Sequence, residues 1–149
     1  MITFNQYLTE LFDKAVPYQS VKTIINSYGS FTKFKFTVGS HYFEVNIGYT
    51  TRDNNIEVDF YLLNPDGSTT VKTTGEAGHQ VSVKVFATVA DILKHALKNW
   101  PNARITFIGD GLSKVKLYRS LGMKLAKVLN YKYDERGAGD WIGVILKPK

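Results

Sequence analysis

Hydrophobic and polar side chains alternate along three successive segments in the first half of the chain. Phe34, Phe36 and Val38 alternate with lysine and threonine, and a period of two recurs over residues 43–49 and 56–62. Successive side chains on a strand point to opposite faces of a sheet, so this period is typical of a half-buried strand. Short polar turns separate the three segments. The pattern predicts three consecutive antiparallel strands with one buried face.

Two further elements are expected around this meander. Apolar residues recur at helical spacing between Leu8 and Ala15, after a capping-box pair at Thr3 and Gln6, and Pro17 ends them. We therefore expect an amphipathic N-terminal helix before the strands. A short strand at 69–72 is expected to extend the meander.

The middle of the chain reads as a strand followed by a helix. Val81, Val83 and Val85 alternate with polar residues, and Thr88 with Asp91 resembles a helix start signal. Residues 105–108 then form a short buried strand. A strand, a helix and a second strand in this order predict a βαβ crossover with parallel strands.

A long basic helix and two closing strands complete the prediction. Ser113 is the expected cap of the helix, and the strands are expected near 131–133 and 141–146 with a loop at 134–140 between them. The expected fold class is α+β: one single domain, residues 1–149, with an N-terminal helix, an antiparallel meander, a βαβ crossover, a long basic helix and two closing strands in a mixed sheet.

Composition narrows the function classes. The chain has 149 residues and no cysteine, which excludes a disulfide scaffold and thiolate metal sites. The N-terminus lacks a basic region followed by an apolar run, and no apolar stretch approaches the length of about 20 residues that a membrane span needs. We expect a protein of the cytoplasm that does not enter membranes.

The net charge of +6 raises the possibility of a nucleic-acid partner. The predicted long helix holds five basic residues and no acid, and these side chains either contact phosphates or form a solvated basic face. They are Lys114, Lys116, Arg119, Lys124 and Lys127.

Other chemical motifs are sparse. The three histidines do not have the short spacing of a zinc site, so no metal is expected. His79 beside Glu76 is either a general base or part of a surface loop. Glu57 and Asp59 share one face of a predicted strand, where two carboxylates either attract a substrate amine or belong to a solvated face.

The order of the predicted elements and one local motif resemble a known family. Residues 114–123 pair Leu117 with Tyr118 and Gly122 with Met123, and this stretch is similar to the last-helix pattern of the GNAT N-acetyltransferases. The chain is also similar to small, uncharacterised phage-encoded proteins, on the stretches 86–89 and 116–118. If a phage encodes it, the expected location is the host cytoplasm.

The resemblance implies a cofactor and its site. In the GNAT family acetyl-CoA lies where two central parallel strands splay, and the start of the crossover helix holds its pyrophosphate. The matching positions here are Ala87, Thr88 and Val89. Tyr118 matches the tyrosine that protonates the departing CoA thiolate in many of these enzymes.

Three functions remain open at this point. The glycines that the family places at its pyrophosphate loop are not found at Ala87 to Val89. This difference favours a phage-encoded, non-catalytic GNAT-like module that binds a host or virion protein, as a monomer or a homodimer. The alternatives are an acetyl-CoA-dependent N-acyltransferase acting through Tyr118 and a basic nucleic-acid-binding module.

Overall fold

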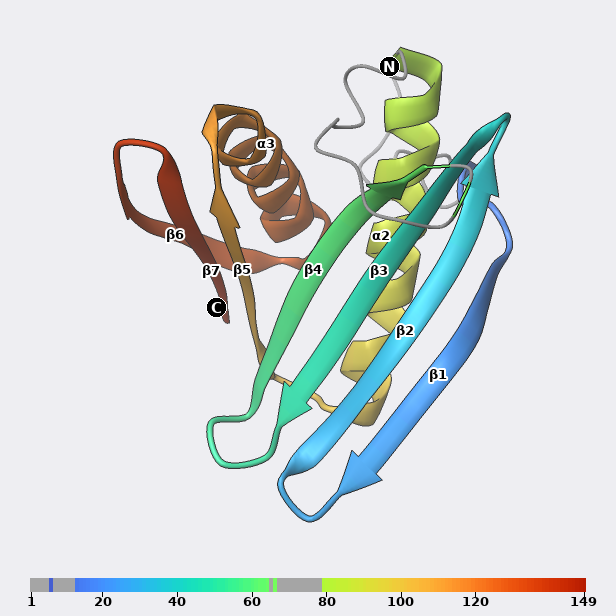
Figure 1. Ribbon diagram of the computed structural model, residues 1–149. Coiled ribbons are helices and arrows are strands. Elements are labelled where there is room, and N and C mark those ends of the chain that lie inside the picture. The colour runs from blue at the N-terminus through green and yellow to red at the C-terminus, as the bar shows by residue number, and fades with distance from the viewer. Residues whose placement is uncertain (1–5, 7–12, 65, 67–78) are drawn as a thin grey trace.

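The computed structural model describes residues 6, 13–64, 66 and 79–149. These residues form one seven-stranded mixed sheet with two helices behind it in the view of Figure 1. The α+β class is therefore confirmed. The elements are β1 (Tyr18–Asn26), β2 (Gly29–Val38), β3 (His41–Thr50), β4 (Asn55–Leu63), α2 (His79–Asn99), β5 (Arg104–Asp110), α3 (Leu112–Leu129), β6 (Tyr131–Ala138) and β7 (Trp141–Pro148).

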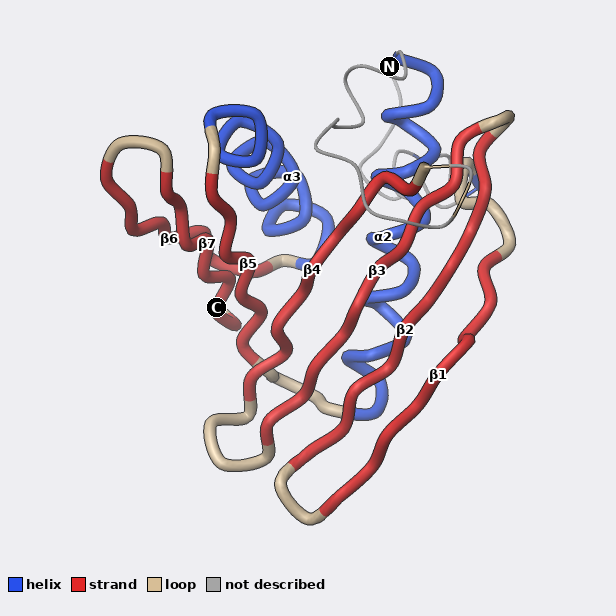
Figure 2. Tube along the Cα trace, in the orientation of Figure 1, coloured by secondary structure: helices blue, strands red, loops and turns tan. Residues whose placement is uncertain are grey.

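The strands lie in the order β1-β2-β3-β4-β5-β7-β6, as Figure 2 shows. β4 and β5 run parallel, with α2 as their crossover, and every other neighbouring pair is antiparallel. β7 returns between β5 and β6, so that β1 and β6 are the two edge strands.

The predicted meander is confirmed as β2, β3 and β4. Its apolar positions face the helices, and Phe36, Phe43 and Phe60 stack across the three strands with ring centroids 5.4 and 5.8 Å apart. β1 adds a strand that was not predicted. Its side chains are exposed along almost the whole strand, so its sequence lacks the alternation that burial of one face imposes.

The predicted strand from Val81 to Val85 is wrong, because these residues form the first turns of α2. The helix therefore starts at His79, well before the signal that we read at Thr88. The parallel crossover is correct, but its first strand is β4. Valines spaced by two residues occur both in strands and in helices. Here they are helical because they belong to a long helix that packs on the sheet.

The C-terminal half follows the prediction closely. α3 buries Tyr118, Leu121 and Leu125 against β5 and β7, but its N-cap is Gly111 and Ser113 lies within the helix. The two closing strands are confirmed. The loop expected at 134–140 is wrong, since β6 continues to Ala138 and pairs with β7 up to Trp141.

Two predicted elements cannot be compared with the structure. The N-terminal helix from Thr3 to Ala15 falls largely outside the described residues, and the short strand at 69–72 falls wholly outside them. No helix of the described chain is both long and apolar enough to cross a membrane.

Candidate functional site at the β4–β5 split

The parallel pair of β4 and β5 is hydrogen-bonded over only part of its length. Its register covers Asn55 to Val58 on β4 and Arg104 to Phe107 on β5. β4 then continues to Leu63 and β5 to Asp110 without pairing with each other. This divergence, which we call the split, leaves the edge of β4 facing α3 instead of a strand.

Tyr118 of α3 reaches into the split. Its side chain is fully buried, its ring packs on Phe107 with centroids 5.5 Å apart, and its hydroxyl accepts a long hydrogen bond from Phe60 N–H at 3.4 Å. The ring fits because residue 109 is glycine, where an added Cβ would lie 2.9 Å from the tyrosine ring. The sequence had singled out Tyr118, and the structure places its hydroxyl where the two parallel strands separate.

The hydroxyl of Tyr118 stays protonated at neutral pH. Burial raises its pKa well above the ordinary value; the hydrogen bond from Phe60 opposes this shift, and the charge of Asp59 adds to it. The phenol therefore carries its proton at neutral pH, and its raised pKa makes it a weaker acid than a solvent-exposed tyrosine.

Lys114 lies one helical turn before Tyr118 and enters the same split. Its Nζ donates to Phe60 O at 3.5 Å and to the Tyr118 hydroxyl at 3.4 Å, and it lies 4.6 Å from the centroid of the Tyr61 ring. Burial lowers the pKa of Lys114, and the negative charge of Asp59 partly opposes that shift. The side chains of Tyr118 and Lys114 thus bond to the backbone of Phe60 on the side where a neighbouring strand would otherwise pair with it.

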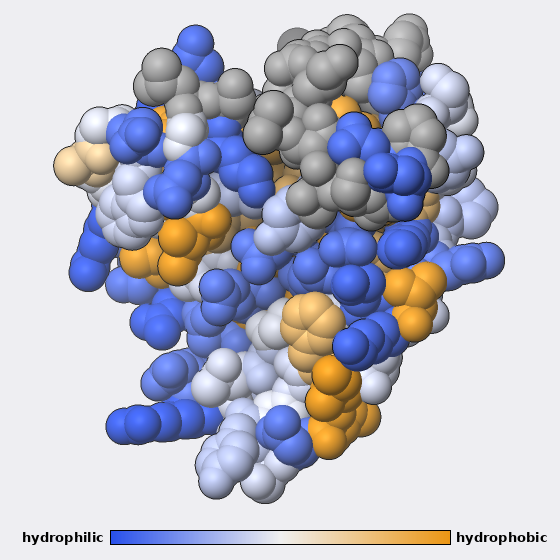
Figure 3. Space-filling model, viewed as in Figure 1, coloured by the Kyte–Doolittle hydropathy of each residue, from blue (hydrophilic) through white to orange (hydrophobic). Residues whose placement is uncertain are grey.

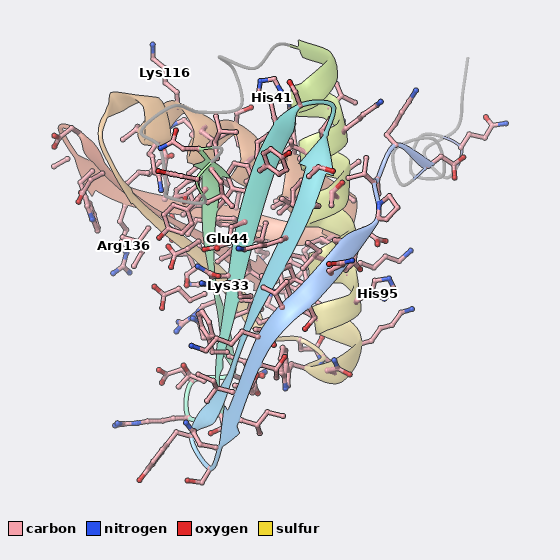
Figure 4. The ribbon with its side chains drawn as sticks, turned by 45° about the vertical axis from the view of Figure 1, so that its right-hand side comes forward. Lys33, His41, Glu44, His95, Lys116 and Arg136 are labelled. Atoms are coloured by element: carbon pink, nitrogen blue, oxygen red, sulfur yellow. The ribbon has the colours of Figure 1, made fainter. Side chains whose placement is uncertain are left out.

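Acidic groups of β3 and β4 lie beside the split on the sheet face opposite the helices. Burial raises the pKa of Asp59, and the charge of Lys114 partly opposes this. Glu44 is buried, accepts a hydrogen bond from Asn46 Nδ2 at 3.2 Å and forms an ion pair with Lys33 at 3.6 Å, as Figure 4 illustrates. Figure 3 shows that this face carries mainly hydrophilic side chains, with separate hydrophobic patches.

The three residues predicted to hold a cofactor are not at a helix terminus. Ala87, Thr88 and Val89 lie inside α2 and are fully buried, so their N–H groups belong to the helical ladder and cannot bind a phosphate. Thr88 has a structural role instead. Its hydroxyl donates to Lys84 O at 2.7 Å and accepts from Val16 N–H at 3.0 Å.

Asp91, which had been read as part of the helix start, lies inside α2 as well. Its carboxylate accepts a hydrogen bond from the Tyr18 hydroxyl at 3.2 Å and lies 3.5 Å from His95 Nε2. Burial, followed by the charge and hydrogen bond of Asp91, raises the pKa of Tyr18 to about 12. These contacts tie β1 to α2.

The corrected helix start also changes which residues precede it. The sequence before His79 reads Thr74-Gly75-Glu76-Ala77-Gly78, which includes two glycines. The absence of glycine at Ala87 to Val89 therefore says nothing about a phosphate loop, because those residues do not precede the helix. Residues 74–78 lie outside the described part of the chain.

The five basic residues of α3 do not share one surface. Lys114 enters the split, and Arg119 Nε donates to Glu135 at 2.9 Å. Lys116 is exposed and points away from the sheet in Figure 4. Lys127 is exposed, and Lys124 Nζ lies 5.8 Å from the ring of Phe86 on α2. This arrangement gives little support to a recognition helix for nucleic acid.

The remaining candidates are not gathered near the split. Glu57 is exposed on β4. His41 has a buried Nδ1 without a hydrogen-bond partner, and His95 faces Asp91. Across the described part of the chain, no three His, Cys, Asp or Glu side chains are arranged to hold a metal ion.

Two pockets lie elsewhere on the described surface. One, of ≈ 390 Å³, lies between Gln19, Lys35, Tyr42 and Leu63 at one end of the meander. The other, of ≈ 220 Å³, lies between α3 and the β6–β7 hairpin near Arg119 and Trp141. The second pocket is lined by Arg119 and Glu135, which form an ion pair at 2.9 Å.

Lys114 was not predicted to belong to the site, because it was grouped with the other basic residues of its helix. Lys114 and Tyr118 are spaced by four residues and therefore project from one side of the helix. That spacing was the available signal.

No family model matches the sequence, and no curated protein or solved structure matches the chain.

Proposed function

We propose that this protein is a GNAT-like domain that binds an acyl-CoA at the β4–β5 split and transfers the acyl group to an amine. The observation that carries the proposal is the Tyr118 hydroxyl, held neutral at the point where two parallel strands separate. Phe60 supplies an N–H and a C=O there that no strand pairs with. The side chains of Tyr118 and Lys114 bond to these two groups, and we expect the amide groups in the arm of coenzyme A to replace them, as another strand would.

Two further features support this site. The single parallel pair within an otherwise antiparallel sheet places the carboxyl ends of β4 and β5 together, which is where ligands of open α/β sheets bind. α2 follows β4 in the chain and starts at His79, after a segment with two glycines. A helix N-terminus preceded by glycine is suited to an anionic group such as a pyrophosphate.

The residues of the split have distinct roles in this proposal. Tyr118 donates its proton to the departing thiolate of CoA. Asp59 lies on the sheet face opposite the helices and attracts a cationic amine acceptor. Raised by burial, the pKa of Asp59 also brings this carboxylate closer to the range of a base that accepts a proton from the amine.

Calorimetric titration with acetyl-CoA and with CoA tests this proposal. We expect micromolar binding of both, and loss of acyl transfer in Tyr118→Phe with only a small change in affinity. Tyr133→Phe is the matched control, because that hydroxyl bonds to Glu135 outside the split. Absence of binding at millimolar ligand, or equal effects of the two substitutions on transfer, would contradict the proposal.

A second candidate function is the non-catalytic module that binds a host or virion protein. The outer edge of β1 favours it, because no described strand pairs with that edge and Ile24 and Ile25 are 47% and 78% exposed beside it. Pull-down of host or virion proteins with wild-type protein and with Ile25→Lys separates the two candidates. A partner lost in the variant, in a protein that does not bind CoA, would replace the first proposal with the second.

A further inference from the structure

Lys114 is placed differently from the other basic residues of α3. Its amino group lies inside the split, 4.6 Å from the centroid of the Tyr61 ring, 5.4 Å from that of the Tyr118 ring and 3.4 Å from the Tyr118 hydroxyl.

Burial raises the neutral, nucleophilic fraction of Lys114 above that of an exposed lysine. The groups that face it are Asp59 and Tyr61 of β4 and Tyr118 of its own helix. Burial lowers the pKa of Lys114, and Asp59 is the charge that opposes this. A lysine amine attacks a carbonyl only when it is unprotonated, so a larger neutral fraction raises its reactivity.

The position of Lys114 also fixes what it can reach. In the proposed function the thioester sulfur lies beside the Tyr118 hydroxyl, and the thioester carbonyl carbon is bonded directly to that sulfur. Lys114 Nζ lies 3.4 Å from the same hydroxyl. The carbonyl carbon of a bound acyl-CoA is therefore within reach of this amine, in the close geometry that accelerates a transfer between two held groups.

We propose that Lys114 is a self-acylation site, modified by the acyl-CoA bound at the split; this inference rests on the proposed function. The neutral Nζ attacks the thioester carbonyl, the new C–N bond forms, and the C–S bond breaks. The amine loses one proton and the thiolate gains one through Tyr118, so that the products are an amide at Lys114 and free CoA. No other reactant is needed.

Acylation changes the site in two ways. An amide keeps one N–H in place of the three N–H donors of the ammonium, and it removes the positive charge that faces Asp59. The added acyl group also occupies the split. Modified protein is therefore expected to bind CoA more weakly, which makes the reaction self-limiting at one acyl group per chain.

The test is peptide mass spectrometry after incubation with acetyl-CoA, with Lys116 as the internal control. Lys116 lies on the same helix but is exposed. We expect Lys114 to be acetylated at least about tenfold faster than Lys116, an effect of proximity. Excess CoA should suppress labelling of Lys114 and leave Lys116 unchanged. Acetyl phosphate, which lacks the CoA moiety, should abolish the preference.

Calorimetry on the same samples separates failure of this inference from failure of the proposed function. If CoA binds and Lys114 is labelled no faster than Lys116, self-acylation is overturned and the binding proposal stands. If CoA does not bind and no preference appears, both are overturned. Lys114→Arg keeps the charge without an acylatable amine, so we expect the total acetylation yield to fall by the share that Lys114 carries in the wild type. Retention of the full acetylation yield in this variant would also overturn the assignment.

Discussion

The two halves of the β4–β5 pair are built differently. In the first half Ile56, Val58, Ile105 and Phe107 are fully buried and the backbones pair with each other. In the second half the strands diverge, and side chains of α3 complete the hydrogen bonds of Phe60. A ligand does not easily displace the backbone hydrogen bonds between two paired strands, whereas it displaces two long side-chain hydrogen bonds more readily. The closed half supports the fold, and the diverging half is where we propose that a ligand binds.

Phe107→Ala should produce the largest loss of stability. Phe107 is fully buried in the closed half and supports the ring of Tyr118, so its truncation leaves a cavity under both elements. We expect the free energy of unfolding to fall by about 3–5 kcal/mol in urea denaturation. A loss below about 1 kcal/mol would show that the closed half is not the rigid part of the pair.

Gly109→Ala should have the next largest effect, at the junction of the two halves. The new Cβ would lie 2.9 Å from the Tyr118 ring, so the ring has to move and its hydroxyl leaves Phe60. We expect a loss of about 1–3 kcal/mol and faster hydrogen exchange of the Phe60 amide. Gly143→Ala is the control, because its Cβ meets nothing closer than 3.6 Å. If Gly109→Ala and Gly143→Ala lose the same stability and show the same hydrogen exchange at the Phe60 amide, Gly109 has no special role.

Lys114→Met should have the smallest effect on stability near neutral pH. Its signature is the pH dependence: the pKa of Lys114 is lowered on folding, so the unfolded chain binds more protons between that value and the ordinary 10.5. Stability contributed by Lys114 therefore rises with pH through this window, and Lys114→Met should lack the rise. The measurement is urea denaturation at several pH values up to the alkaline range. If the free energy of unfolding changes with pH in the same way for Lys114→Met and for the wild type, burial does not perturb the pKa of this amine.

The sequence alone predicts the buried parts of the fold better than its edges. The meander and α3 were correct because their apolar residues follow the period of a strand or a helix, which burial on one side enforces. β1 was missed because an edge strand exposed along its length needs no such pattern. The start of α2 was misplaced because Val81 to Val85 satisfies a strand pattern while packing makes it helical.

The candidate site was predicted only in part. Tyr118 was chosen by its resemblance to a motif, and its location at the split could not be derived from spacing. The predicted cofactor residues followed the misplaced helix start, and the structure places them inside α2. The pairing of Lys114 with Phe60 joins residues 54 positions apart in the chain. Only the fold brings such residues together.

The most direct test of the split as an acyl-CoA site is a titration of ¹⁵N-labelled protein with CoA, followed by the backbone amide resonances. The account predicts that the largest shifts occur at Phe60 and Tyr61 on β4 and at Ile108 and Gly109 on β5, with small changes at Ile56 and Ile105 in the closed half. Saturating CoA that leaves the Phe60 amide unchanged, or that shifts mainly the β1 edge, would contradict it.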